Sequence, residues 1–196
     1  LWDLAGKAAD VPIYQLLGGR VRNEIPIKMV VGAFDVPKAV SLAEQFLDWG
    51  VRCLKVKVGL DPGVDLQRVK AVRAVAGPDI PIGIDVNCGW SLDTARRMLP
   101  TLEPYDLLFA EQPIPPGDPE SLAQLRQVTS VPIMADESVF TLTDAWTVTT
   151  ARAADVLSVY PGKQGGLAVL LEIAHLAKAA GIVCHMGSNL ELGIAT

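Results

Sequence analysis

Short apolar segments rich in Val and Ile recur along the chain, and longer stretches with helical spacing lie between most of them. In the stretch at 36–49, apolar Val40, Ala43 and Phe46 enclose polar Glu44 and Gln45, which is a period of about 3.6 residues. The same pattern predicts strands within Ile25–Gly32, Cys53–Gly59, Pro81–Asn87, Leu107–Pro113, Pro132–Ser138, Val156–Gly162 and Gly181–Gly187, and helices within Val36–Trp49, Pro62–Val75, Ser91–Leu102 and Gly166–Ala180.

Alternation of strand and helix indicates parallel strands joined by right-handed crossovers. The predicted strands are apolar on both faces, as expected when helices cover one side and a barrel core lies on the other. We therefore predict an α/β fold, a (β/α)₈ TIM-type barrel with about seven of its eight βα units present. The alternative is a doubly wound open sheet, which is disfavoured because no Gly-x-Gly-x-x-Gly turn follows an early strand.

Polar side chains end four consecutive predicted strands. Lys57, Asp85, Glu111 and Asp136 follow one another at intervals of 25 to 28 residues, which is one βα unit each. In a barrel the carboxyl ends of the strands form one face, where catalytic residues collect. Three carboxylates converging there repel one another unless a cation neutralises them. Their oxygen donors favour Mg²⁺, with Mn²⁺ as the substitute, whereas a single such residue could instead cap the next helix.

Lys55 and Lys57 lie two residues apart and so share one face of their strand. Two neighbouring ammonium groups lower each other's pKa, which favours a neutral amine able to accept a proton. The other interpretation is that both lysines form ion pairs with the neighbouring carboxylates. Asn87 and Glu137 lie close in sequence to Asp85 and Asp136. We expect them either to support the metal ligands through hydrogen bonds or to act as additional ligands.

Composition narrows the class of protein. The 196 residues carry a formal net charge of −5, and 50% of them are hydrophobic. These values indicate a globular protein with a sizeable core and argue against nucleic-acid binding. No apolar run is long enough to span a bilayer and no secretory leader is recognised, so we expect no membrane association and a cytoplasmic location. Cys53, Cys88 and Cys184 are expected to be reduced thiols.

Taken together, the strand-end motifs resemble those of the enolase superfamily, most closely the mandelate racemase / muconate lactonizing enzyme group. They are Lys55-Val56-Lys57, Asp85-Val86-Asn87, Glu111-Gln112-Pro113 and Asp136-Glu137-Ser138, and the opening segment from Trp2 to Gly19 is similar as well. The resemblance implies a Mg²⁺-dependent enzyme that removes the proton alpha to a carboxylate and stabilises an enediolate. It also implies that an N-terminal capping domain is absent from this chain, with 1–22 as a lead-in helix and 23–196 as the barrel domain.

The resemblance assigns roles residue by residue. Asp85, Glu111 and Asp136 match the metal ligands, and Lys57 matches the base. Lys55 matches the neighbour that keeps the amine of the base at a low pKa. Glu191 matches the late glutamate that contacts the substrate carboxylate or stabilises the intermediate. The implied partner is a small-molecule carboxylate, and the protein is expected to form a homo-oligomer.

The second acid/base of the resembled group does not match. Where its lactonizing and dipeptide-epimerising branches have a second Lys, this chain has Tyr160, and the His position of the racemase branch falls at Gly187. Tyr160, Lys163 and His185 are the candidates to replace it. Their alternatives are that Tyr160 fills the barrel mouth, that Lys163 is solvated in a Pro-Gly loop, and that His185 is a core residue.

A single matched base favours a muconate-cycloisomerase-like isomerase, with a sugar-acid dehydratase or a racemase/epimerase as alternatives. Other classes remain open. A Schiff-base aldolase would use a strand-end Lys but leaves the carboxylates unexplained, and a phosphate-binding barrel would rest only on the short turn Met186-Gly187-Ser188. An inactive barrel is favoured by the missing second base and opposed by the complete set of carboxylates and lysines.

Overall fold

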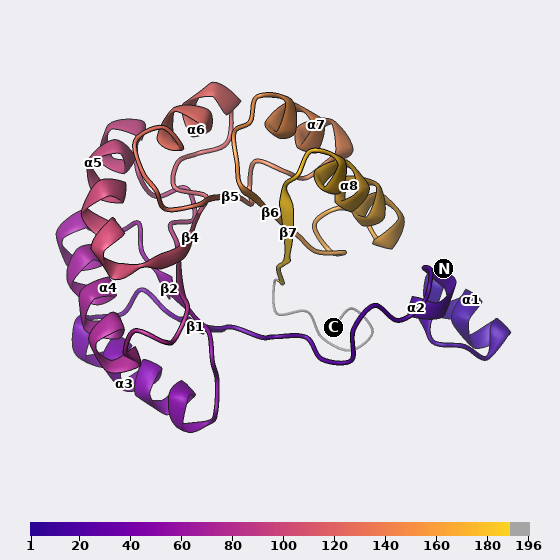
Figure 1. Cartoon of the computed structure of the whole chain (residues 1–196), viewed down its shortest axis with the longest axis horizontal. Helices are drawn as coiled ribbons and strands as arrows, with labels where there is room; N and C mark the ends of the chain where they lie inside the picture. The colour runs from indigo at the N-terminus through magenta and orange to yellow at the C-terminus, as the bar shows by residue number, and fades with distance from the viewer. Residues whose placement is uncertain (189–196) are drawn as a thin grey trace.

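Seven parallel strands form one curled sheet in the computed structural model, which describes residues 1–188 (Figure 1). Their order in the sheet is their order in the chain, and each strand pairs only with its sequence neighbours. The strands are β1 (Met29–Val31), β2 (Leu54–Lys57), β3 (Ile82–Asp85), β4 (Leu107–Glu111), β5 (Ile133–Ala135), β6 (Val156–Val159) and β7 (Val183–Met186). All seven predicted strands are confirmed, each shorter than its apolar run.

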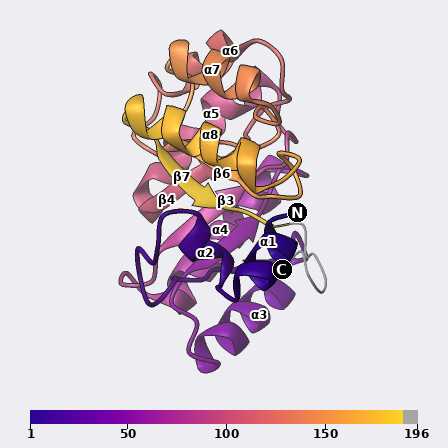
Figure 2. The same cartoon turned by 90° about the vertical axis from the view of Figure 1, so that its right-hand side faces the viewer.

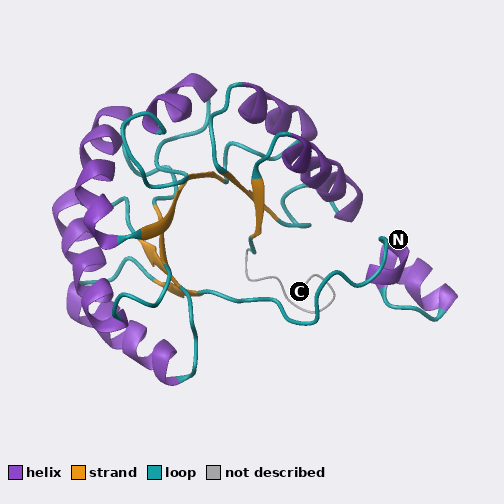
Figure 3. Ribbon diagram, viewed as in Figure 1, coloured by secondary structure: helices purple, strands orange, loops and turns teal. Residues whose placement is uncertain are grey.

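Helices cover the outer face of the sheet and leave the inner face to the barrel interior (Figure 3). They are α3 (Val36–Asp48), α4 (Pro62–Ala76), α5 (Leu92–Leu102), the 3₁₀ helix η1 (Glu103–Tyr105), α6 (Pro119–Leu125), α7 (Leu142–Thr150) and α8 (Leu167–Ala179). Five of these helices begin at a residue whose side chain accepts a hydrogen bond from a backbone N–H of the first turn, namely Asp35, Asp61, Ser91, Asp118 and Thr141. Such caps fix where each helix leaves the loop after its strand.

The sheet is an incomplete barrel. β1 and β7 lie at its two edges and are not paired with each other within the described part of the chain. A doubly wound sheet would reverse its strand order part-way, so the sequential order confirms the barrel prediction. Figure 2 shows the molecule from the side on which β7 and α8 lie.

The barrel interior and the helix-facing layer use alternate residues of each strand. On β2, Leu54 and Val56 are fully buried under the helices, and Lys55 and Lys57 point inward. Inside the barrel the ring of Phe109 lies so close to Gly83 that a Cβ there would come within 2.3 Å of it. Glycine at position 83 therefore makes room for the aromatic side chain.

The chain opens with α1 (Trp2–Ala9) and α2 (Ile13–Leu16), which pack on each other. In Figure 1 this pair lies away from the sheet and is joined to β1 by an extended segment. Helix α1 lies within the segment 1–22, and the assignment of that segment as a lead-in to a barrel domain at 23–196 stays a prediction. Over residues 1–188 no helix is both long enough and apolar enough to cross a membrane. The three cysteines are free thiols, as expected.

Candidate active site

A cavity of about 380 Å³ lies at the inner face of the sheet. Its lining joins the carboxyl ends of β2 to β6 with β7 and with the segment before β1. The predicted strand-end residues meet there, since its charged and polar lining includes Lys28, Lys55, Lys57, Asp85, Asn87, Glu111, Asp136, Ser158, Tyr160 and His185.

Lys55 bridges two of the predicted metal ligands. Its Nζ lies 2.8 Å from Asp85 Oδ2 and 2.9 Å from Glu111 Oε2, and all three side chains are nearly buried. Burial alone would lower the pKa of Lys55, but the carboxylates of Glu111 and Asp85 raise it above its usual value. The expectation that Lys55 has a lowered pKa is therefore wrong in this structure, because its two carboxylate partners outweigh the effect of burial.

The pKa values of the two carboxylates, Glu111 and Asp85, shift in opposite directions. Burial, together with the nearby Asp85 and Asp136, raises the pKa of Glu111. Burial would also raise the pKa of Asp85, but the lysines at 55 and 57 contact it and lower that pKa instead. Asp85 is thus the carboxylate that the lysines hold in its charged form.

Lys57 stands at the outer rim of this cluster. Its Nζ lies 2.8 Å from Asp85 Oδ2 and also donates to Asn87 Oδ1. Its side chain is 29% exposed, against 11% for Lys55. Of the two lysines on β2, Lys57 is therefore the one that an incoming ligand can reach more readily.

The loop after Lys57 is fixed by a buried ion pair that sequence patterns did not indicate. Arg68 NH1 lies 2.8 Å from Asp65 Oδ1, and both side chains are almost fully buried on α4. Arg68 also donates to the carbonyls of Lys57 and Phe34, and Asp65 accepts from the N–H of Gly59 at 2.8 Å. The pair holds the end of β2 against α4.

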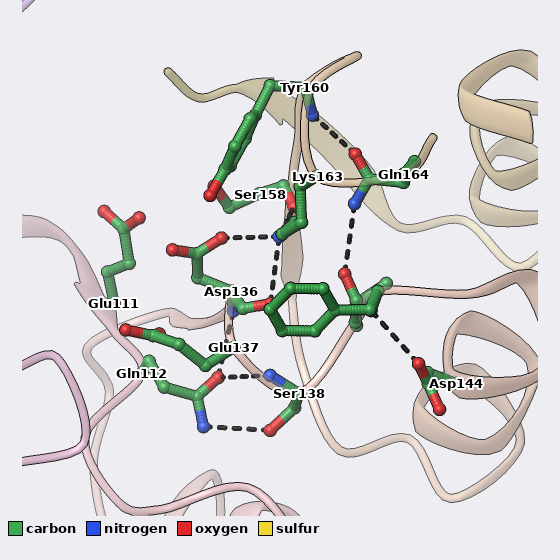
Figure 4. A network of polar contacts seen from close by, with 12 residues as sticks. Glu111, Gln112, Asp136, Glu137, Ser138, Asp144, Ser158, Tyr160, Lys163 and Gln164 are labelled. Atoms are coloured by element: carbon green, nitrogen blue, oxygen red, sulfur yellow. Dashed lines mark hydrogen bonds and ion pairs between the residues drawn. The ribbon is translucent and has the colours of Figure 1, made fainter. Parts of the chain in front are cut away.

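Asp136 is held by Lys163, as Figure 4 shows. Lys163 Nζ lies 2.5 Å from Asp136 Oδ1 and also donates to the carbonyls of Asp136 and Ser158, at 2.9 and 2.7 Å. The lysine side chain is only 1% exposed, so the expectation that Lys163 is solvated is wrong. It is not part of the cavity lining, which makes it a partner of Asp136 rather than a group that faces a substrate.

Gln112 fixes the other side of Asp136, and sequence reasoning gave it no role. Its fully buried side chain accepts from the N–H groups of Asp136 and Ser138 at 3.0 and 3.1 Å, and its Nε2 donates to the Ile114 carbonyl and Ser138 Oγ (Figure 4). The signal in the sequence was an uncharged polar residue directly after Glu111 at the end of an apolar strand.

Tyr160 and His185 both line the cavity, unlike Lys163. Tyr160 is 7% exposed, and its ring lies over Lys163 Nζ at 4.9 Å. His185 contacts Lys28 and lies 5.5 Å from the ring of Phe109, centroid to centroid. Lys28 is a cavity residue that sequence reasoning missed, although it is the single charged residue in the apolar run from Ile25 to Val31. Glu191 lies outside the described residues.

The donor set of the cavity suits a hard cation. It offers carboxylate oxygens from Asp85, Glu111 and Asp136, the ligand type that Mg²⁺ prefers. Nearby, Glu137 Oε1 accepts from Asn87 Nδ2 at 3.0 Å, and the buried Glu137 Oε2 has no hydrogen-bond partner among residues 1–188. Within those residues no three acidic, His or Cys side chains are gathered closely enough to hold an ion. Lysine ammonium groups neutralise the carboxylates here instead.

Comparison with known proteins identifies the family. The family model described as enolase C-terminal domain-like, of the mandelate racemase / muconate lactonizing enzyme group, matches residues 38–196. The chain belongs to this family. It is 33% identical to N-succinyl-L-Arg/Lys racemase of Bacillus cereus and 36% identical to muconate cycloisomerase 1 of Rhodococcus opacus, each match covering the whole chain and 53% of the relative.

Solved structures of the enolase C-terminal domain-like family share the fold. The N-succinyl Arg/Lys racemase from Bacillus cereus superposes with a TM-score of 0.96 at 33% identity, over 99% of this chain and 53% of that one. A dipeptide epimerase from Cytophaga hutchinsonii, complexed with Mg and the dipeptide D-Ala-L-Val, gives 0.93 at 34% identity, over 96% and 51%. The chain thus spans about half the length of these relatives, as a partial barrel domain of the superfamily.

Proposed function

We propose that this chain is the barrel half of a Mg²⁺-dependent enzyme that removes the proton alpha to a carboxylate, as a muconate-cycloisomerase-like isomerase. The observation that supports this most is the convergence of Lys55, Lys57, Asp85, Glu111 and Asp136 on one cavity. Relatives named as cycloisomerases, racemases and epimerases agree with an isomerase.

In this proposal Lys57 is the base. It lies at the cavity rim, with its amine beside Asp85 and Asn87. To accept a proton, its ammonium must first give one up, and any cation that takes over the charge of Asp85 weakens the ion pair between Asp85 and Lys57. Lys55 and Glu111 remain paired with each other deeper in the cavity, and this ion pair fixes the orientation of both side chains.

Asp85, Glu111 and Asp136 would hold Mg²⁺. When bound, the ion would stabilise the negative charge that develops on the substrate carboxylate as the α-proton leaves. Lys163 and Gln112 keep Asp136 in a fixed orientation for this task. Glu191 keeps the role that the family resemblance gives it, contact with the substrate carboxylate or the intermediate.

Racemisation or epimerisation is the second candidate. It requires a second acid or base on the opposite side of the substrate from Lys57. Tyr160 directly follows β6 and His185 lies on β7, across the curled sheet from β2, and both residues line the cavity. Tyr160 occupies the position where epimerases of the resembled group have a second Lys, so it is the stronger of the two.

The decisive test uses the complete protein in D₂O and follows by NMR the uptake of deuterium at the carbon alpha to the carboxylate, which occurs by exchange in N-succinyl amino acids and dipeptides and by protonation after ring closure in muconate. Muconate, N-succinyl amino acids and dipeptides serve as substrates, since they distinguish cycloisomerisation from racemisation. We expect EDTA to abolish exchange and Mg²⁺ to restore it. Lys57→Met should lower the rate by about 10²–10⁴-fold, because it removes the proton acceptor.

The matched control is Lys70→Met, which removes an exposed lysine of α4 and should leave the rate unchanged. Exchange that is indifferent to EDTA, or that survives Lys57→Met, would contradict the proposal. Borohydride trapping of substrate on a lysine would instead support the Schiff-base aldolase, and no turnover of any carboxylate would support an inactive barrel.

A further inference from the structure

One buried ion pair on α4 contacts the loops that surround Lys57. Asp65 and Arg68 lie one turn apart on the helix, and their side chains are 1% and 3% exposed. Two charges removed from water to this degree often contribute no more to stability than apolar side chains of similar volume would. The effect of this pair therefore depends on which other groups it holds in place.

Arg68 fixes the backbone of Lys57. Its NH1 donates to Asp65 Oδ1 at 2.8 Å and to the Lys57 carbonyl at 3.2 Å, and its Nε donates to the Phe34 carbonyl at 2.7 Å. Phe34 follows β1 and Lys57 ends β2, so one guanidinium group joins two neighbouring strand ends. Because the guanidinium is planar and its donors have fixed directions, it holds the two carbonyls in a fixed arrangement.

Asp65 fixes the residues that follow Lys57 in the same loop. Its Oδ2 accepts from the N–H of Gly59 at 2.8 Å and from Nε1 of Trp90, in the loop after β3, at 3.4 Å. Gly59 has a φ of +101°, and a Cβ there would lie 2.4 Å from the Val86 carbonyl oxygen. The loop after β2 is thus packed against the loop after β3, with no space between them for a side chain.

The amine of Lys57 contacts this same loop after β3. Its Nζ lies 2.8 Å from Asp85 Oδ2 and also donates to Asn87 Oδ1. A shift of the Lys57 backbone against the loop after β3 would weaken these contacts and move the amine within the cavity. The two ends of Lys57 are therefore fixed by different groups, the backbone by the ion pair on α4 and the amine by the end of β3.

We propose that Asp65 and Arg68 are positioning residues that keep the base Lys57 in place beside Asp85. The inference rests on the proposed function, in which Lys57 takes the α-proton. Among residues 1–188 the cavity lining includes Lys57 but neither member of the pair, so the pair acts through Lys57 and does not touch the substrate. Proton transfer requires the base within hydrogen-bond reach, and a displacement of about 1 Å can lower the rate by about 10²-fold.

The test compares Arg68→Lys with Arg73→Lys in the complete protein. Arg73 lies near the end of the same helix and donates to four backbone carbonyls, two of them at Ile80 and Tyr105, which precede β3 and β4 at the opposite end of the sheet. In each variant a lysine keeps the charge but lacks the planar fork. Arg73→Lys should therefore lower the urea midpoint at least as much as Arg68→Lys, without affecting the site.

Activity is measured as deuterium uptake from D₂O with muconate, N-succinyl amino acids and dipeptides, in the presence of Mg²⁺. We expect Arg68→Lys to lower kcat by about 10- to 100-fold and to keep KM within about twofold of the parent. Arg73→Lys should keep both values. Calorimetry should show that all three proteins bind Mg²⁺ equally well. Trp90→Phe removes only one donor to Asp65 and should lower kcat by about twofold or more, so the role of the pair can be tested even if Arg68→Lys does not fold.

A second readout follows Lys57 without turnover. Lysine amines are labelled with trinitrobenzenesulfonate in the absence of Mg²⁺, and the labelled positions are located by mass spectrometry. We expect Lys57 to be labelled about threefold faster or more in Arg68→Lys than in the parent, as the weakening of one hydrogen bond allows. The exposed Lys70 should be labelled at the same rate in both proteins.

The remaining outcomes separate this inference from the proposed function. Parental kcat or unchanged labelling of Lys57 in Arg68→Lys would overturn the positioning role and leave the proposed function standing. Equal losses of kcat in Arg68→Lys and Arg73→Lys, or a loss explained by a higher KM or by weaker Mg²⁺ binding, would overturn it as well. If the parent takes up no deuterium into any of these substrates, the proposed function fails and this inference fails with it.

Discussion

Four lysines in or beside the cavity differ in what each of them contacts. Lys55, Lys57 and Lys163 neutralise carboxylates, whereas Lys28 contacts the neutral ring of His185. Lys163 is the most buried of the three paired lysines, and it makes two further hydrogen bonds to backbone carbonyls. The buried Lys163 side chain therefore helps to stabilise the fold around Asp136.

Replacing Lys163 tests this role. Lys163→Met keeps the length of the side chain but leaves the Asp136 carboxylate and two carbonyls without their donor. We expect the protein to lose about 3 kcal/mol of stability, the cost of removing one partner of a buried ion pair. Urea unfolding of the variant against the parent measures this loss. Lys178→Met, an exposed lysine of α8, is the control, and equal midpoints for Lys163→Met and the parent would refute the expectation.

At the scale of elements, polar side chains join the ends of neighbouring strands. Gln112 follows β4 and binds backbone groups that follow β5. Gln164, in the loop after β6, accepts from the Tyr160 N–H at 2.7 Å and donates to the Val139 carbonyl at 3.0 Å. These contacts replace sheet hydrogen bonds where the ladder ends, so the strand ends keep a fixed spacing.

Gln112→Leu tests this link between β4 and β5. The substitution leaves the N–H groups of Asp136 and Ser138 unpaired in a buried place, at about 1–3 kcal/mol for each group. We expect a loss of roughly 3 kcal/mol in chemical denaturation and weaker Mg²⁺ binding in calorimetry. Gln127→Leu changes an exposed glutamine of the same barrel and serves as control. A Gln112→Leu protein with parental stability and metal affinity would rule out the link.

For the molecule as a whole, the contact between Lys28 and His185 joins two opposite edges of the curled sheet. The two residues are 157 positions apart in the chain, and β1 and β7 do not pair with each other within residues 1–188. Together with the tilted contact between Phe109 and His185, this contact fills the space between the edges. The ring of His185 is therefore a neutral element of the barrel interior.

This arrangement predicts how stability depends on pH. Burial lowers the pKa of His185 from 6.5 to about 4 in the folded state. Between these values the unfolded chain binds a proton that the folded chain does not, so stability falls as the pH drops from about 6.5 towards 4. We expect His185→Gln to lose less stability than the parent over that window. His175→Gln, at the exposed histidine of α8, should behave as the parent does, and parallel curves for all three proteins would contradict the prediction.

The arrangement of strands was predictable because strands that are buried on both faces appear in the sequence as short, continuous apolar runs. Two features of the fold were not predicted from this pattern. Within the run from Ile25 to Gly32, only residues 29–31 pair in the sheet, since Ile25 and Ile27 are exposed and no strand of residues 1–188 lies beside them. Helices α6 and α7 were also not identified from the pattern, because α6 has seven residues and α7 is rich in threonine, which weakens its helical signal.

The sequence by itself determined the fold class, the family resemblance and the meeting of Lys57, Asp85, Glu111 and Asp136 at one end of the sheet. It could do so because strand ends recur at a fixed interval in a βα repeat. Only the tertiary structure decided which charges pair. The side chain of Lys163 contacts Asp136, and that of Lys28 contacts His185, and in each pair the two residues lie far apart in the sequence. The reversal of the expected pKa shift at Lys55 has the same origin, because electrostatic energies depend on distances in space and not on spacing along the chain.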